Sequence, residues 1–175
     1  MPTYRTADLS DAPRLAALAE HTFRETFAEF NTAENMDLHC GAFYGAEIQA
    51  KEILEADTTT MIAELEGGFI GFLRVRRKSP PVDLPCTNPF ELQRLYVDRR
   101  WHGQGVAHRL MAEALRLAKI GGADTIWLGV WAHNPRALAF YEKCGFTAAG
   151  EHVFPVGHDP QRDIIMVRPV ELDGA

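Results

Sequence analysis

Hydrophobic positions in this chain follow two periods, one of two residues and one of three to four. Segments that alternate or are rich in β-branched residues predict strands; these are residues 3–6, 58–65, 69–76, 91–97, 125–131, 146–154 and 163–170. Segments with apolar residues at helical spacing predict helices; these follow Ser10 and Asn31, span residues 46–55, begin at Val106 and run from Asn134 to about Cys144. Strands mixed with helices, ending in an antiparallel pair, are typical of an α+β fold.

Two of the helix starts carry local signals. Ser10 is a candidate N-cap, with Pro13 in the first turn of the helix that follows. Asn31 and Glu34 have the spacing of a capping box, which predicts that the second helix begins at Asn31.

Glycine and proline mark the connections. Residues 66–68 predict a hairpin turn, residues 121–122 end the long helix, and residues 155–162 join the last two strands. Residues 78–89 contain four prolines and predict a loop. Because strands of similar character lie on both sides, we interpret it as a surface loop beside the functional site, within a single domain spanning residues 1–175.

Composition narrows the class of protein. The chain is 46% hydrophobic and 24% charged, which is ordinary for a globular protein, and no apolar run is long enough to span a membrane. The formal net charge of −6 argues against a nucleic-acid partner, which needs a basic surface, and is compatible with a cationic substrate. Charged residues precede any apolar run, and the three cysteines show no paired spacing, so we expect no signal peptide and a cytoplasmic location.

Residues 91–111 combine a strand, a glycine-containing turn and the start of a helix. Free N–H groups and the positive end of the helix dipole converge at such a helix start. The small residues Gly103, Gly105 and Ala107 allow an anion to approach the backbone closely. No Lys-Ser or Lys-Thr follows the glycines, as a P-loop requires, and position 108 is His where a dinucleotide fingerprint has a third glycine. The pattern therefore indicates either a different kind of pyrophosphate site or an ordinary tight turn.

This stretch resembles motif A of the GCN5-related N-acetyltransferases, in which Gln/Arg-x-x-Gly-x-Gly/Ala follows a Leu-x-Val strand. His102, Gly105 and Ala107 occupy the three defined positions, with His102 in place of the usual Gln or Arg. A second register, starting at Arg100, satisfies the pattern literally but puts the helix residues out of step. The resemblance spans most of the chain and implies acetyl-CoA as co-substrate and a mixed, strongly bent sheet of about seven strands.

The resemblance also implies which groups hold the co-substrate. The pyrophosphate is expected on the loop and the first helical turn, which comprise His102, Gly103, Gln104, Gly105, Val106 and Ala107. Backbone groups of Leu95 and Val97 are expected to pair with the pantetheine as if it were an added strand.

Residues 130–146 resemble motif B of the same family, where Asn-x-x-Ala is followed by a Tyr near the end of a helix. Here these residues are Asn134, Ala137 and Tyr141. The resemblance implies that Asn134 contacts the pantetheine region and that Tyr141 is the general acid at the thioester sulfur. A Tyr hydroxyl suits this role because it donates a proton without being ionised at neutral pH. The alternative for Tyr141 is a core aromatic that packs its helix on the sheet.

An attacking amine must first lose a proton, since an alkyl ammonium has a pKa of about 10.4. Glu91 is the leading candidate base: it shares strand parity with Gln93, Leu95 and Val97, so we expect all four side chains on one face. Family members carry a basic glutamate at the position of Glu91 or of Gln93, and here only Glu91 can ionise. A solvated charge at the start of a strand is the alternative.

Three further stretches, residues 21–36, 126–146 and 154–166, resemble the bacterial Pai-type spermine/spermidine acetyltransferases. The first of them brings together three candidate acceptor-binding residues, Glu25, Glu29 and Glu34, with Glu25 and Glu29 expected on one helical turn. Their negative charge favours a polyamine or other small cationic amine. Simple solvation of an exposed helix face is the alternative for these residues.

Other functions remain open at this point. The acceptor can be a protein or peptide amine, and the domain can be a non-catalytic acetyl-CoA-binding regulator. Homodimers are common in the family, so a homodimer is possible here. The histidines and cysteines form no His-x-x-x-His or Cys-x-x-Cys spacing, so we expect no metal.

Overall fold

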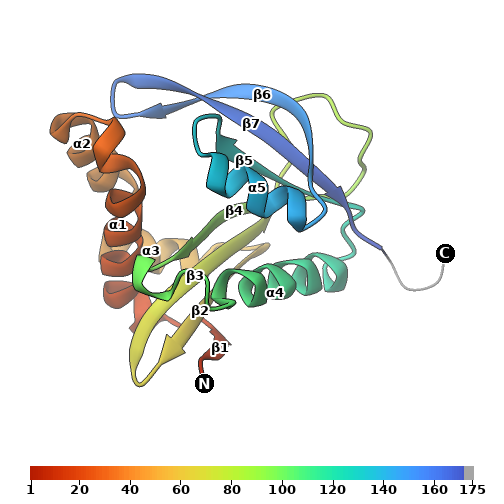
Figure 1. Cartoon of the computed structure of the whole chain (residues 1–175). Helices are drawn as coiled ribbons and strands as arrows, with labels where there is room; N and C mark the ends of the chain where they lie inside the picture. Colours follow the sequence, from red (N-terminus) through yellow and green to blue (C-terminus); the bar gives the residue numbers. More distant parts are fainter. Residues whose placement is uncertain (172–175) are drawn as a thin grey trace.

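The computed structural model describes residues 1–171 and is built on one seven-stranded sheet in the order β1-β2-β3-β4-β5-β7-β6 (Figure 1). The strands are β1 (Thr3–Thr6), β2 (Thr58–Leu65), β3 (Gly68–Arg77), β4 (Pro89–Val97), β5 (Thr125–Trp131), β6 (Thr147–Val156) and β7 (Asp159–Pro169). Only β4 and β5 are parallel neighbours, so the sheet is mixed, as the resemblance implied.

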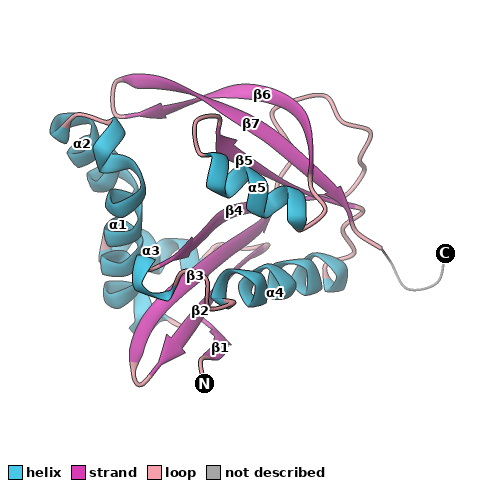
Figure 2. Ribbon diagram, viewed as in Figure 1, coloured by secondary structure: helices cyan, strands magenta, loops and turns pink. Residues whose placement is uncertain are grey.

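Helices cover both faces of this sheet (Figure 2). They are α1 (Ala12–Phe27), α2 (Ala33–Phe43), α3 (Ala46–Leu54), α4 (Val106–Ile120) and α5 (Pro135–Lys143), with short 3-10 turns η1 (Leu9–Asp11), η2 (Ala28–Phe30) and η3 (Arg99–Trp101). On one face α4 buries Leu110 completely, and on the other α1 buries Leu15 at 1% exposure. Burial of one such side chain stabilises the fold by about 1.5–3 kcal/mol. No helix within residues 1–171 is long and apolar enough to cross a membrane.

The sheet divides at its centre. β4 and β5 are paired only where Pro89–Glu91 lies beside Thr125–Trp127. Beyond this junction β4 stays with β3 and β5 stays with β7, and Figure 2 shows the two strands separating. Arg74 faces Arg94 while Val75 faces Leu92, so Gln93 is an extra residue in β4. Such a bulge bends a strand and increases its twist, which explains why the two strands part just after it.

The predicted N-cap Ser10 is wrong: the N-cap of α1 is Asp11, without a side-chain hydrogen bond of its own. Asp8 is the N-cap of the preceding turn η1: its carboxylate accepts a hydrogen bond from the Ser10 N–H at 2.8 Å, and Asp11 completes a capping box. The Asp8 carboxylate also accepts a hydrogen bond from the Ser10 hydroxyl, so Ser10 is held by the cap, and η1 precedes α1.

The second helix also begins one residue later than predicted. Thr32 is the N-cap of α2, and its hydroxyl accepts from the Asn35 N–H at 3.2 Å. The Asn31 amide instead donates to the Phe27 carbonyl at 2.9 Å, which closes the end of α1. Glu34 therefore lies in the first turn of α2 without a capping-box partner at Asn31.

The predicted loop over residues 155–162 is wrong as well. β6 and β7 continue through it as a hairpin, with Pro155 opposite Pro160, and turn tightly at Gly157 (φ +60°). Proline is tolerated here because β5 pairs with β7 only from Asp163 onward, so no third strand needs the missing N–H. The hairpin tip reaches α2, where the His158 N–H donates to Asn35 at 2.9 Å (Figure 1).

The proline-rich loop lies at the other end of the sheet from the place where β4 and β5 separate. The Trp127 indole donates to the Lys78 carbonyl at 2.7 Å, and Asp124 accepts hydrogen bonds from Thr87 and Asn88. The loop therefore braces the paired ends of β4 and β5. The expectation that it lies beside the functional site is wrong, since none of its residues lines the cleft described next.

Candidate functional site

A cleft of about 520 Å³ occupies the gap between the diverging ends of β4 and β5. Of the residues singled out from the sequence, those that line it are Glu25, Glu29, Gln93, Leu95, Val97, His102, Ala107, Asn134, Ala137 and Tyr141. Those that do not line it are Glu34, Glu91, Gly103, Gln104, Gly105 and Val106. The two predicted motifs therefore meet at one place, although they are separated by a helix and a strand in the sequence.

The loop before α4 has the geometry of an anion cradle. Gly103 and Gly105 have φ of +76° and +82°, and no atom lies within 4 Å of the position where a Cβ would be. Val106 is buried at 2% exposure and anchors the first turn in the core. The first helical bond runs from the Arg109 N–H to the Gly105 carbonyl, so the preceding N–H groups have no partner within the helix. This arrangement fits a pyrophosphate group.

Two side chains of this loop are turned back toward the protein. The His102 Nε2 donates to the Val97 carbonyl at 2.8 Å, which ties the loop to the end of β4. The Gln104 amide donates to the Arg100 carbonyl at 3.1 Å. The loop backbone, rather than the Gln104 side chain, is therefore what faces an incoming anion.

The cleft side of β4 offers backbone groups. Leu95 and Val97 direct their side chains into the core cluster shared with α4. Residues 92–97 of β4 and 128–131 of β5 have no ladder pairs with each other in the described structure. Their facing N–H and C=O groups are available to a ligand, and buried backbone groups of this kind are normally paired.

Helix α5 contributes the residues of the second motif. Asn134 is its N-cap, and the side-chain oxygen accepts from the Ala137 N–H at 3.1 Å. Tyr141 lies in the last turn of α5 and packs against Phe146 with ring centroids 5.9 Å apart. Tyr141 also lines the cleft. Burial raises the pKa of the Tyr141 hydroxyl, so it stays protonated at neutral pH and can donate a proton.

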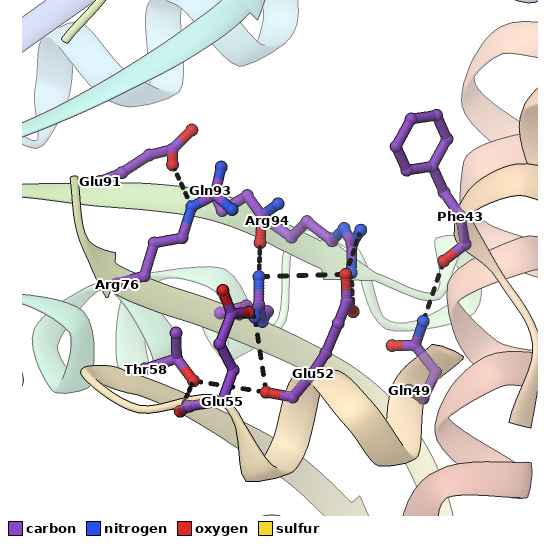
Figure 3. A network of polar contacts seen from close by, with 10 residues as sticks. Phe43, Gln49, Glu52, Glu55, Thr58, Arg76, Glu91, Gln93 and Arg94 are labelled. Carbon is purple, nitrogen blue, oxygen red and sulfur yellow. Dashed lines mark hydrogen bonds and ion pairs between the residues drawn. The ribbon is translucent and has the colours of Figure 1, made fainter. Parts of the chain in front are cut away.

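Glu91 and Gln93 are held by arginines on the neighbouring strand. Arg76 donates to the Glu91 carboxylate, and Arg74 donates to the Gln93 side-chain oxygen. Figure 3 shows Glu91 directed at Arg76 within a polar network that also joins α3 to β4. In that network Arg94 binds both carboxylate oxygens of Glu52, at 2.6 and 3.0 Å.

The predicted common face of Glu91, Gln93, Leu95 and Val97 is wrong. The extra residue at Gln93 shifts the alternation of β4 by one position. Glu91 and Gln93 therefore face the arginines, while Leu95 and Val97 face α4. A bulge cannot be recognised from the hydrophobic pattern of a single strand.

The three acidic residues are not equivalent. Glu25 accepts a hydrogen bond from the Arg99 N–H at 3.2 Å and lies 3.4 Å from His21, so it stabilises η3. Glu29 is exposed on η2, beyond the end of α1, so Glu25 and Glu29 do not share a helical turn as predicted. Glu34 lies outside the cleft. The structure therefore brings Glu25 and Glu29 to the cleft and leaves Glu34 outside it.

Side-chain donors of His21, Glu25 and Asp98 lie within 4.8 Å of one another, which raises the question of a metal. Asp98 is already paired with Arg100 at 2.6 Å, and this guanidinium lowers the pKa of the carboxyl. Glu25 is engaged by a backbone N–H. Arg100 therefore already balances negative charge in this cluster, and we assign no metal to it.

An aromatic wall is the main feature that sequence reasoning missed. Its members come from α1, η2, α2, β4, β5 and β6, and are Phe23, Phe27, Phe30, Phe43, Tyr44, Tyr96, Trp131 and Phe154. Phe30 and Phe27 pack against Trp131 with centroid distances of 5.0 and 5.8 Å. The one signal in the sequence is that Phe27 and Phe30 extend the apolar surface past the first helix.

Three more cleft residues were not predicted. Arg99 and Arg136 are exposed beside the cradle loop and at the start of α5, and Asp163 is a buried carboxyl on β7. Nothing in their sequence neighbourhood distinguishes them from surface charges, because the register of β7 and the entry of α5 place them.

Comparison with known proteins gives a consistent result. The model of the acetyltransferase (GNAT) family matches residues 15–146. An uncharacterized N-acetyltransferase of Mycobacterium bovis is 31% identical, covering 91% of this chain and 98% of its own length, and one of Lactobacillus delbrueckii subsp. lactis is 27% identical over 89% and 90%. The crystal structure of the PaiA N-acetyltransferase of Thermoplasma acidophilum, in complex with coenzyme A, superposes with a TM-score of 0.80 at 21% identity, covering 97% of this chain and 99% of that one.

Proposed function

Because this chain belongs to the acetyltransferase (GNAT) family, we propose that it acetylates a small cationic primary amine, with polyamines as the leading class. It is an N-acetyltransferase with acetyl-CoA as co-substrate. The observation that supports the finer proposal is the cleft itself, which runs from the edge of the anion cradle, at His102 and Ala107, to an aromatic wall bordered by carboxylates.

We assign the co-substrate to the cradle side. Acetyl-CoA supplies an activated acetyl group as a thioester and carries phosphates that need positive partners. The open backbone from Gly103 to Ala107 and the positive end of α4 meet that need. Arg99 and Arg136 add two exposed positive charges at the cleft. The backbone of Leu95 and Val97 and the amide of Asn134 then face the remaining chain of the molecule.

Tyr141 is the proposed general acid. It lines the cleft from α5, and its hydroxyl is protonated at neutral pH because burial raises its pKa. Donation of its proton to the departing sulfur lowers the cost of breaking the C–S bond.

The acceptor is assigned to the aromatic side. Aromatic faces attract alkylammonium groups through their quadrupole, most strongly for Trp. Trp131 belongs to this wall, and Phe27 and Phe30 pack against it. Glu29 is an exposed carboxylate at the same cleft and favours a second positive charge on the acceptor.

A matched pair of amines tests this assignment. Cadaverine and pentylamine have the same carbon chain and differ by one ammonium group. With acetyl-CoA and a thiol-reactive dye, we expect kcat/KM about tenfold higher for cadaverine, equivalent to about 1.4 kcal/mol. Spermidine and a peptide with a free N-terminal amine complete the panel.

The other outcomes separate the alternatives. Equal rates for the matched pair would remove the polyamine assignment and leave the acetyltransferase intact. A preference for the peptide indicates a protein or peptide acetyltransferase. Binding of acetyl-CoA by calorimetry without thiol release from any amine indicates a regulatory module.

The expected cytoplasmic location and homodimer belong to the same proposal. Free thiols at Cys40, Cys86 and Cys144 are compatible with a reducing compartment. Light scattering of the purified protein distinguishes a dimer from a monomer.

A further inference from the structure

Asp163 is a buried carboxyl that faces the cleft without a neutralising partner. It lies on β7 opposite Trp131 of β5 and His152 of β6, and it is 8% exposed. Among residues 1–171, the one basic side chain within 4 Å of this carboxylate is His152, whose Nε2 is 3.9 Å away, too far for a hydrogen bond. Buried carboxylates are normally paired or hydrogen-bonded, so this one calls for an explanation.

The strand beside Asp163 is open at this position. Gly129 of β5 lines the cleft, and a Cβ on it would lie 3.3 Å from the Asp163 carboxylate and 3.4 Å from His152. Any larger side chain would cover the carboxylate. Glycine within a strand often marks a place where a ligand approaches closely, and here it leaves a path from the cleft to Asp163.

The groups that surround Asp163 do not supply a counter-charge. Tyr96 of β4 is close enough for the Asp163 charge to act on it, and burial together with that charge raises the pKa of Tyr96 to about 12. Burial lowers the pKa of His152, which is therefore neutral at pH 7. Gln161 on the same strand bonds to Asn31 and Asp159 instead. Burial raises the pKa of Asp163 itself to about 6.

We propose that Asp163 is the catalytic base that accepts the proton of the acceptor amine. This assignment rests on the proposed amine acetylation and adds a residue to it. Glu91, the candidate from the sequence, is engaged by Arg76 and does not line the cleft, whereas Asp163 lines it together with Tyr141.

The proton balance is simple. An alkylammonium loses two protons on becoming an amide. Asp163 accepts the first and returns it to solvent, which leaves a neutral amine with a free electron pair. As the new C–N bond forms and the C–S bond breaks, Tyr141 gives its proton to the sulfur, and the second amine proton replaces it on the tyrosine oxygen.

Asp163→Asn tests the proposal because it keeps the size of the side chain and removes the base. With cadaverine as acceptor at pH 7, we expect kcat to fall about 100-fold while the KM for acetyl-CoA stays unchanged. The wild-type rate should rise with pH through about 6, as the Asp163 carboxyl ionises, and the variant should lose this step. The deficit should shrink toward pH 10, where a much larger fraction of the amine is neutral without help from a base.

Two further variants make the result decisive. Asp159→Asn makes the same chemical change on an exposed residue of β7 outside the cleft, and it should behave as wild type. Glu91→Gln removes the competing base. If Glu91→Gln shows the fall and the recovery at high pH while Asp163→Asn does not, Asp163 is not the base. A rise in acceptor KM alone for Asp163→Asn would overturn the proposal in favour of an ammonium anchor.

Thermal stability provides a readout that does not depend on activity. The pKa of this carboxyl is 3.8 in a model compound and about 6 in the folded protein, so folding becomes less favourable as pH rises from about 4 to about 6. Asp163→Asn should therefore raise Tm at pH 7, and the gain should vanish near pH 4. A lower Tm at pH 7 would mean that Asp163 is a structural partner and would overturn its role as a base, whether or not any amine is acetylated.

Discussion

The two sides of the cleft are built in different ways. The cradle side is nearly continuous in sequence: the end of β4, η3, the glycine loop and the start of α4 follow one another. The acceptor side brings together rings from α1, η2, α2, β4, β5 and β6, with residues as distant as Phe23 and Phe154. The first side acts through backbone groups and the second through side chains. A site of the first kind can be recognised from a short motif, and a site of the second kind requires the fold.

The two sides of the cleft should also respond differently to changes in their side chains. A backbone cradle makes few demands on its side chains, and the His102 ring is turned back to bond to the Val97 carbonyl. The aromatic wall acts through its side chains, so each ring contributes its own contact. We therefore expect related chains to share the cradle and differ in the wall.

The largest effect should come from the residue where the two sides meet. Tyr141→Phe removes one hydroxyl and little volume, so kcat should fall about 100-fold or more while calorimetric binding of acetyl-CoA is retained. A change in kcat of less than about twofold, with chemistry rate-limiting, would make Tyr141 a packing residue of α5.

The next effect should be confined to the cradle. Gly105→Val places a side chain where the φ is +82° and the space is open, so the KM for acetyl-CoA should rise about tenfold through lost backbone approach. Gly67→Val is the matched control, since Gly67 has φ +76° and equally open space in a hairpin far from the cleft. Both variants should lose stability by about 1–2 kcal/mol. If both raise the KM alike, strain rather than the cradle is responsible.

Changes in the aromatic wall should affect the KM for the acceptor amine and leave the KM for acetyl-CoA unchanged. Trp131→Leu should raise the KM for cadaverine by roughly tenfold, because a cation–π contact of about 0.5–2 kcal/mol is lost. Trp131→Phe keeps a ring and should recover most of the loss. An equal rise in the KM for acetyl-CoA would contradict the division of the cleft into two sides.

The smallest effect should come from the exposed charge. Glu29→Gln should raise the KM for cadaverine by about twofold at low salt and flatten its salt dependence. Glu34→Gln changes an exposed glutamate outside the cleft and should have no effect. If the two variants behave alike, the acidic surface serves solvation.

The sequence predicted the parts of the fold that depend on local pattern. The strands Thr3–Thr6 and Thr125–Trp131 and the end of α4 at Gly121 agree with the structure. Glu91 shows where such patterns fail. In a regular strand its side chain would share a face with Leu95 and Val97, but the extra residue at Gln93 places it on the opposite face, toward Arg76.

The same distinction between local pattern and tertiary contact applies to the candidate site. Tyr141 and the glycine loop could be proposed from the sequence because each belongs to a motif with its own spacing. Asp163 could not, because its neighbours Gly129 and His152 reach it only through strand pairing. Which carboxylates are neutralised by arginines is likewise decided by tertiary contacts.

Only three residue pairs join β4 to β5, so the sheet consists of two halves that meet at this short junction. A molecule bound across the gap contacts both halves and holds them together. Its binding stabilises the folded state, and above the dissociation constant the gain rises with the logarithm of its concentration. Amide hydrogens of residues 92–97 and 128–131 that face the gap should exchange rapidly in the free protein and slowly in the complex. The set of amides that become protected therefore shows how far along the gap the bound molecule extends.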